Sequence, residues 1–182
     1  TEICTKNDII FIYESWTHTN SNIDIQGFKS FNFYRHYQHR RARRHSGGVV
    51  VYIRNSIANG ISVVRNHFNT IIWLKLDNTF FKLDEDAFVC GVYIWGEDSP
   101  MYNIENVDLF SLLENDIFHY DNLGSTNVIG DFNGRVGLKH DFIICDKNIV
   151  QIDSDEYVPD HLLSRASQDL VSNTQGTKIL DM

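Results

Sequence analysis

Proline and glycine are scarce in this chain, which has only 2 Pro and 11 Gly among 182 residues. That composition argues against a collagen-like or linker-rich organisation. Long apolar runs are missing as well; the stretch Val49 to Ile53, for example, ends at Arg54, far short of a membrane span. We therefore expect no membrane partner. Residues 1–8 lack the basic segment followed by an apolar one that typifies a secretory signal.

Cysteine is also infrequent, and the three copies, Cys4, Cys90 and Cys145, lie far apart without the pair spacing of a metal site. Two of them fall in apolar, strand-like runs, so we expect buried free thiols. Free thiols fit a reducing compartment better than secretion, which predicts an intracellular protein.

Basic residues are in the minority, with 16 Lys and Arg against 24 Asp and Glu, for a net charge of −8. Any contact with nucleic acid would need a local basic patch or bound metal ions. Aromatic residues, by contrast, are abundant at 13%, which suits packed sheets. The length allows one substantial core and is short for two domains. We therefore expect residues 1–182 to form a single domain.

Apolar runs typical of strands dominate the first hundred residues. Asp77-Asn78 resembles a hairpin turn that leads from one strand to Phe80-Phe81. The predicted strands are 9–14, 28–34, 48–54, 61–65, 70–77 and 87–94.

The apolar period changes after residue 100 and predicts a helix, with Asn103 as its N-cap. A strand over 127–132 follows, and a second helix begins at Gln175. That helix stops at Met182 without a capping glycine or proline, so we expect the domain to be incomplete. The apolar residues at helical spacing in the first helix are Val107, Phe110, Leu113 and Ile117.

Two apolar runs each deliver an acid at the C-terminal end of a predicted strand, where α/β sheets place their sites. Glu14 follows Ile9–Tyr13, and Asp131 follows Val128–Gly130. We interpret the second run as a buried strand, in which a carboxylate needs a partner such as a metal ion. One or two carboxylates suffice for Mg²⁺, which keeps several waters. We expect both acids to share one cation across adjoining strand ends.

Two further side chains accompany these acids. Asn133 faces the same side as Asp131 if the strand continues, and its amide could bond a phosphate oxygen or a water. Tyr93 ends the apolar run 88–92, and its hydroxyl could reach a phosphate. The alternatives are that residues 131–134 form only a turn and that Tyr93 is only a core-edge tyrosine.

A basic stretch over residues 35–45 has two interpretations, a solvated loop or a surface that follows phosphates. Its arginines oppose metal binding, so we expect no zinc site at its histidines. We also expect no catalytic role for Asp160-His161, because such dipeptides arise easily in loops. The histidines of the basic stretch are His36, His39 and His45, and the four arginines of interest are Arg40, Arg41, Arg43 and Arg44.

Taken in order, these motifs resemble the endonuclease/exonuclease/phosphatase superfamily, which includes deoxyribonuclease I, apurinic endonucleases and inositol polyphosphate phosphatases. The similarity is closest to the apurinic-type endonuclease domain of non-LTR (LINE-like) retrotransposon proteins, in which Ser15 is usually Thr. The tail of the chain also looks like the stretch that follows the Gly-Asp-Phe-Asn motif in such proteins, at Ser164–Asp169, Asn173, Gly176 and Leu180. The matching motifs are Tyr13–Trp16, Ser46–Tyr52, Gly91–Tyr93 and Gly130–Gly137.

The resemblance implies an α/β fold of two packed mixed β-sheets flanked by helices, as in deoxyribonuclease I. It implies phosphodiester hydrolysis with Mg²⁺ or Mn²⁺, held by Glu14 and Asp131. Asp131 would also orient or deprotonate the attacking water, while Asn133 and Tyr93 would position the phosphate. Arg135 and the four arginines of the basic stretch would bind nucleic acid.

The resemblance further implies DNA as the partner, a nuclear location and a downstream reverse-transcriptase domain in the parent chain. The family's first-strand Asn would lie before Thr1, and its closing Asp and Ser-Asp-His motif beyond Met182. We therefore expect weak metal binding and little hydrolysis by this chain alone. The leading hypothesis is a DNA-nicking endonuclease of a retroelement-derived protein. A non-catalytic remnant that binds nucleic acid or protein, and a phosphatase for inositol lipids or similar substrates, remain alternatives; no oligomeric state follows.

Overall fold

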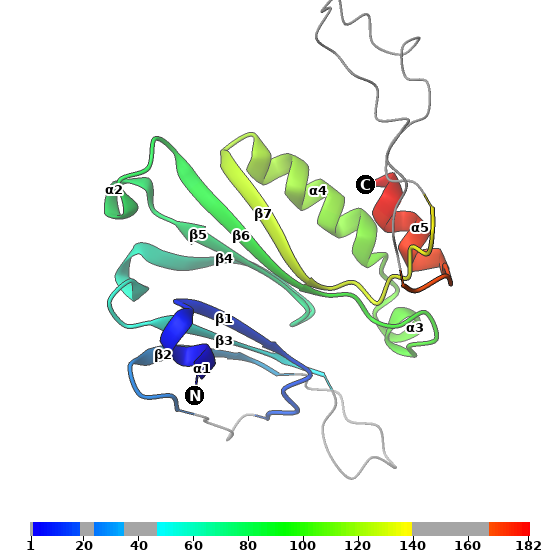
Figure 1. Cartoon of the computed structure of the whole chain (residues 1–182), viewed down its shortest axis with the longest axis horizontal. Helices are drawn as coiled ribbons and strands as arrows, with labels where there is room; N and C mark the ends of the chain where they lie inside the picture. Colours follow the sequence, from blue (N-terminus) through cyan, green and yellow to red (C-terminus); the bar gives the residue numbers. More distant parts are fainter. Residues whose placement is uncertain (1, 19–23, 35–46, 140–167) are drawn as a thin grey trace, which may run out of the picture. The chain divides into compact units, whose positions relative to one another are not determined.

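The computed structural model describes residues 2–18, 24–34, 47–139 and 168–182 (Figure 1). The chain divides into two compact units. The first comprises residues 1–94 and 102–131, and the second comprises residues 95–101 and 132–182. Within the first unit the chain is α/β, with two β-sheets and few helices, as expected. The expectation that residues 1–182 are a single domain stays a prediction.

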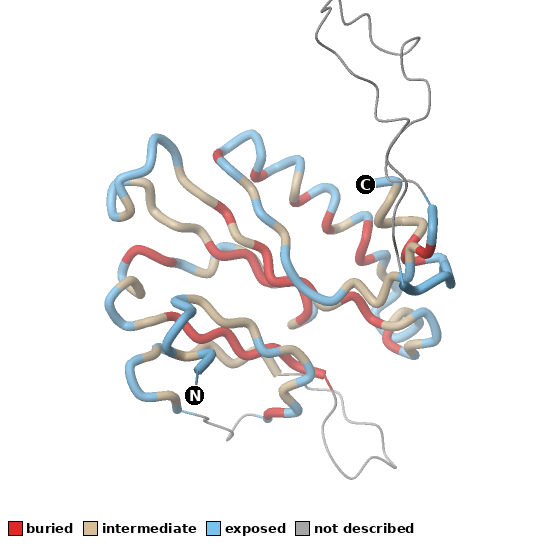
Figure 2. Tube along the Cα trace, in the orientation of Figure 1, coloured by how far each residue is buried: buried red, intermediate tan, exposed pale blue. Residues whose placement is uncertain are grey.

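The first sheet has β3 at its centre, with the strand order β1-β3-β2. Residues Val49 to Ile53 of β3 are at most 4% exposed, as the continuous apolar run predicts (Figure 2). Both neighbours pair with β3 in antiparallel register. The prediction of a mixed sheet is therefore wrong here, because β3 separates the two strands that run the same way. The strands are β1 (Ile9–Tyr13), β2 (Phe28–Phe33) and β3 (Val49–Arg54).

The second sheet is mixed, as predicted, with the order β4-β5-β6-β7. Its first two pairings are antiparallel, whereas β6 and β7 are parallel. A parallel pair needs a crossover connection, and the helix α4 (Leu109–Asp121) lies within it. The strands are β4 (Ile61–His67), β5 (Ile71–Leu76), β6 (Asp86–Tyr93) and β7 (Gly124–Asp131).

The core of the first unit lies between these two sheets. Phe11 of β1 occupies the space beside Gly91 of β6, where an added Cβ would lie only 2.1 Å from its ring. Any larger residue at this position would push the sheets apart. The fully surrounded core residues are Val49, Val51 and Ile53 from β3, Ile61 from β4, and Ile72 and Leu74 from β5.

Helix α4 (Leu109–Asp121) covers the other face of the second sheet. Its Tyr120 packs against Trp73 and Phe88, at ring-centroid distances of 4.5 and 4.7 Å. Asp116, only 2% exposed, accepts a hydrogen bond from His67 Nε2 at 2.9 Å and another from Arg65 Nη1. A buried carboxylate is tolerated here because both bonds come from basic side chains.

Two local predictions are wrong, the N-cap at Asn103 and the hairpin turn at Asp77-Asn78. In both places an aspartate caps a helix instead. Asp108, not Asn103, caps α4, accepting from the Phe110 amide at 3.0 Å. Asp77 accepts from the Phe80 amide at 2.8 Å and starts a short helix in place of the hairpin turn. Asp and Asn serve turns and N-caps alike. The short helices are α1 (Glu2–Lys6), η1 (Ala58–Gly60), α2 (Asn78–Phe81) and α3 (Met101–Glu105).

The remaining element predictions are confirmed. The first six strands begin and end within two residues of their predicted limits. The strand predicted over 127–132 begins earlier, at Gly124, and the second predicted helix is α5 (Thr174–Asp181). None of the helices in the described ranges is long and apolar enough to cross a membrane.

Candidate active site

Glu14 lies directly after β1, as predicted, and the two residues that follow it are bonded to the glycines that precede β3. The turn that it begins is held by two hydrogen bonds, from the Ser15 amide to the Gly48 carbonyl at 3.2 Å and from the Trp16 amide to the Gly47 carbonyl at 3.0 Å. Glu14 and Trp16 both adopt a φ of +52°. Each such residue is strained by roughly 1–3 kcal/mol, a feature that clusters at functional sites.

Both oxygens of the exposed Glu14 carboxylate accept hydrogen bonds. Tyr93 Oη donates to Glu14 Oε1 at 2.6 Å, and Trp16 Nε1 donates to Glu14 Oε2 at 3.3 Å. Tyr93 is the last residue of β6, so the first bond joins the end of the second sheet to the residue that follows β1. Both donors are neutral groups, so neither hydrogen bond is an ion pair.

Asp131 is the last residue of β7, and its register partner on the parallel strand β6 is Tyr93. Register partners on neighbouring strands point to the same face of a sheet and lie roughly 5 Å apart. Asp131 is therefore beside the tyrosine that binds Glu14. The strands that carry the two acids do not adjoin within one sheet, contrary to expectation: β1 and β7 belong to different sheets.

The prediction that Asp131 ends a buried strand is wrong. β7 is the last strand in the order of the second sheet among the described residues, and Ile129 and Asp131 are both exposed. The β-branched run forms a largely exposed strand because, among the described residues, only β6 pairs with it. Asp131 thus needs no cation to offset burial, and the case for a metal rests on the neighbouring groups instead.

Tyr13 is a site residue that the sequence interpretation missed. Its ring stacks on Tyr93, with centroids 6.2 Å apart, and its hydroxyl donates to the Ile129 carbonyl of β7 at 3.2 Å. Burial raises the pKa of the Tyr13 hydroxyl, and the negative charge of Asp131 contributes to the same shift. Two tyrosines therefore link the sheets: Tyr13 of the first sheet donates to β7 of the second, and Tyr93 of the second sheet donates to Glu14, which follows β1 of the first. The sequence shows Tyr13 at the end of an apolar strand and at the start of the motif Tyr13–Trp16, and neither feature singles out this role.

Gly130 makes the close approach of these groups possible. Its φ is +150°, and a Cβ there would lie 1.9 Å from the Val92 carbonyl oxygen and 2.9 Å from the Tyr13 hydroxyl. Only glycine fits before Asp131, because the backbone of Val92 on β6 and the side chain of Tyr13 on β1 occupy the space that a Cβ would need.

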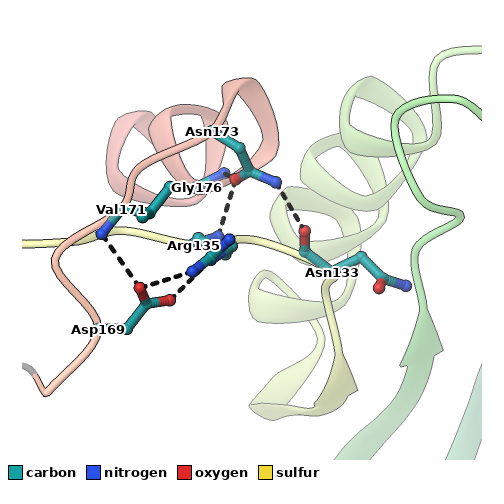
Figure 3. A network of polar contacts seen from close by, with 6 residues as sticks. All are labelled: Asn133, Arg135, Asp169, Val171, Asn173 and Gly176. Carbon is teal, nitrogen blue, oxygen red and sulfur yellow. Dashed lines mark hydrogen bonds and ion pairs between the residues drawn. The ribbon is translucent and has the colours of Figure 1, made fainter.

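In the second unit, Asn133 does not continue the strand. It has a φ of +49°, so the argument that placed it on the face of Asp131 fails. Its carbonyl oxygen accepts from Asn173 Nδ2 at 3.0 Å, while Asn173 Oδ1 accepts from the amides of Arg135 and Gly176, each at 2.8 Å (Figure 3). Asn173 thus caps α5 and also holds the segment that carries Asn133.

Arg135, predicted to bind nucleic acid, forms a two-fold contact with Asp169 in Figure 3. Its Nε and Nη2 each donate to that carboxylate at 2.8 Å. The pKa of Asp169 falls to about 2, first because of Arg135 and then because the Val171 amide donates to the same carboxylate. Since one acid already engages this guanidinium, contact with a phosphate would have to compete with it.

This pair predicts an acid-sensitive contact. The Asp169 carboxyl has a pKa lowered from 3.8 to about 2. The contribution of its contact with Arg135 to the stability of the fold is therefore complete above about pH 4, and it is lost as the pH falls towards 2 and the carboxylate is protonated. We expect the amide NMR signal of Val171 to shift over that interval. Asp169→Asn should abolish the transition, and Asp181→Asn, on the same segment, should leave it in place. A shift that persists in Asp169→Asn would contradict the assignment.

Several predicted features lie outside the described residues. They are the four arginines Arg40, Arg41, Arg43 and Arg44, the histidines His36, His39 and His45, and the dipeptide Asp160-His161. The predicted surface that follows phosphates therefore stays a prediction.

The described residues fit a hard divalent cation that keeps most of its waters. Glu14 offers an exposed, charged carboxylate that forms no ion pair with any described residue, and a second carboxylate, Asp131, lies beside its Tyr93 partner. Mg²⁺ is commonly bound by only one or two carboxylates. No group of three or more His, Cys, Asp or Glu side chains gathers anywhere in the described ranges, at this site or at another. Comparison with models of protein families and with curated protein sequences finds no match for this chain.

Proposed function

We propose that this chain is a metal-dependent phosphodiesterase, a DNA-nicking endonuclease of a retroelement-derived protein acting in the nucleus. The observation that carries the proposal is the hydrogen bond from Tyr93 to Glu14, made beside Asp131. This bond joins the residue that follows β1 to the last residue of β6, and Asp131 is the register partner of Tyr93 on β7. The two-sheet α/β arrangement is compatible with the deoxyribonuclease I-like fold that the sequence resembles.

Each residue has a distinct role in the proposed reaction. Glu14 would hold Mg²⁺ or Mn²⁺, with Tyr93 and Trp16 fixing its carboxylate. The ion, when bound, would polarise a phosphoryl oxygen and stabilise the leaving oxyanion. Asp131, exposed to solvent, would orient the attacking water and accept its proton. The proposed contribution of Asn133, positioning the phosphate, comes from the resemblance alone.

The test is plasmid nicking in Mg²⁺ against EDTA, with residues 1–182 and in parallel with the longest chain that the reading frame encodes. Nicking that requires Mg²⁺ supports the proposal. If both proteins bind DNA but neither nicks it, the non-catalytic alternative is correct. One observation favours that alternative: the described residues hold no group of three or more His, Cys, Asp or Glu side chains that could bind a metal ion.

Glu14→Gln should weaken Mn²⁺ binding about tenfold or more. The substitution keeps an acceptor for Tyr93 but removes a unit charge beside a dication, roughly 1 kcal/mol or more even at a solvated site. Electron paramagnetic resonance of free Mn²⁺ measures the affinity directly. Glu105→Gln, an exposed carboxylate at the end of α3, is the matched control and should bind as the unaltered chain does. Equal affinities for both variants would remove Glu14 from the metal site.

A further inference from the structure

Trp16 differs from the other tryptophans of the chain in its exposure. The chain has three tryptophans. Trp73 and Trp95 are 0% and 1% exposed, whereas 44% of Trp16 is exposed. Large aromatic side chains are usually well buried, because they carry much apolar surface. An exposed indole next to the Glu14 carboxylate therefore calls for an explanation.

The backbone around Trp16 holds it in this exposed position. Its φ of +52° is unfavourable for a bulky side chain, and Glu14 has the same value. Hydrogen bonds nonetheless hold each of the residues Ser15, Trp16 and Thr17 in place. Besides the two backbone bonds to Gly47 and Gly48, the buried Thr17 hydroxyl donates to Asn32 Oδ1 at 2.6 Å and lies 3.0 Å from Ser15 Oγ. A strained conformation that its surroundings determine so fully is typical of a functional site.

The indole is also oriented. Its Nε1 edge donates to Glu14 Oε2, and this bond limits the rotation of the ring about its side-chain torsions. The ring therefore stands beside the carboxylate that we propose holds the metal ion. Whatever contacts its exposed surface would lie next to the reacting phosphate.

We propose that Trp16 is a substrate-binding residue that stacks on an unpaired nucleobase adjoining the phosphate that is cleaved. The inference rests on the proposed function and names the substrate feature that the same site binds. A nucleobase fits because it offers a neutral aromatic face that can stack on the exposed indole. Stacking on aromatic side chains is how proteins bind single-stranded DNA without reading its sequence.

The emission of Trp16 provides a direct measurement. Because the other two tryptophans are buried, a short single-stranded DNA that stacks on Trp16 should quench the exposed part of the fluorescence. The titration is done in EDTA, so that binding is seen without cleavage. A fully paired duplex of the same sequence should quench less. Trp16→Phe should remove the response altogether.

Two variants of Trp16 separate its proposed stacking on the base from its hydrogen bond to Glu14, through the KM for nicking and the affinity for Mn²⁺. Trp16→Leu removes the aromatic face and should raise the KM for nicking about tenfold, which corresponds to about 1.4 kcal/mol, within the range for one stacked base. Trp16→Phe keeps an aromatic face but loses the Nε1 donor, so it should retain KM better and lose more Mn²⁺ affinity. Phe118→Leu, at a 75% exposed aromatic on α4, is the matched control and should change neither quantity.

The outcomes distinguish this inference from the proposed function. Unchanged emission with single-stranded DNA, or an unchanged KM in Trp16→Leu while Asp131→Ala abolishes nicking, overturns the stacking role and leaves the nuclease intact. Quenching by single-stranded DNA together with equal nicking by Asp131→Ala supports stacking and overturns the proposed site. Equal quenching by single strand and duplex overturns the preference for an unpaired base.

Discussion

Replacing Asp131 by Ala should lower the rate of Mg²⁺-dependent plasmid nicking about a thousandfold, the middle of the range for losing a general base. The carboxylate is exposed beside Tyr93, where it can reach a water without displacing any core group. The loss should appear in kcat more than in KM, because Asp131 is proposed to act on the water and not on the bound DNA. Nicking is measured in Mg²⁺, with EDTA as the blank.

The same substitution should leave folding almost unaffected. Asp131 is exposed, and substitutions at such positions usually change the free energy of unfolding by at most about 0.5 kcal/mol. Asp84→Ala, at an exposed acid in the turn before β6, is the matched control and should nick as the unaltered chain does. Equal nicking by the Asp131 and Asp84 variants would show that the site has been assigned to the wrong residues.

Gly130→Ala should destabilise the first unit by about 3 kcal/mol or more. Two effects add at this position: a φ of +150°, which strains any residue with a Cβ, and a Cβ that would lie 1.9 Å from the Val92 carbonyl oxygen. Because that oxygen belongs to the backbone of β6, it can move only if the pairing of β6 with β7 changes. Urea unfolding followed by circular dichroism measures the loss.

Gly27→Ala separates the two effects. Gly27 also has a positive φ, +87°, but an added Cβ there would have no atom within 4 Å. Its substitution should therefore show the conformational strain alone, roughly 1–2 kcal/mol. The difference between the two variants is the steric contribution of Val92 and Tyr13. Equal destabilisation by both would mean that the close contact at Gly130 relaxes without consequence.

The strands were predictable because their signal is local. The run Val49 to Ile53 can be interpreted from its own residues, and it forms the fully buried central strand that such a run predicts. Helix α4 was predictable for the same reason, since Phe110 and Leu113 are apolar at helical spacing and both are buried. Its start was not, because Asn103 and Asp108 are equally able to cap a helix and only the packing of α4 selects Asp108.

The burial of β7 shows where local interpretation fails. Val128 and Ile129 resemble residues of a central strand, yet β7 pairs only with β6 among the described residues, and Ile129 is 50% exposed. Strand order is a property of the whole sheet, so a β-branched run by itself cannot distinguish a central strand from an outer one. The prediction that Asn133 lies on the same face as Asp131 was wrong for a similar reason, because the strand ends at Asp131 and the backbone turns at Asn133.

The sequence by itself determined which residues carry charge and where the strands end: Glu14, Tyr93 and Asp131 each stand at or directly after the end of a strand. Only the tertiary structure decided that Tyr93 donates to Glu14 and that Tyr13 reaches β7. The physical reason is that strand ends follow from short-range side-chain patterns, whereas a hydrogen bond between residues 79 apart depends on how two sheets pack face to face.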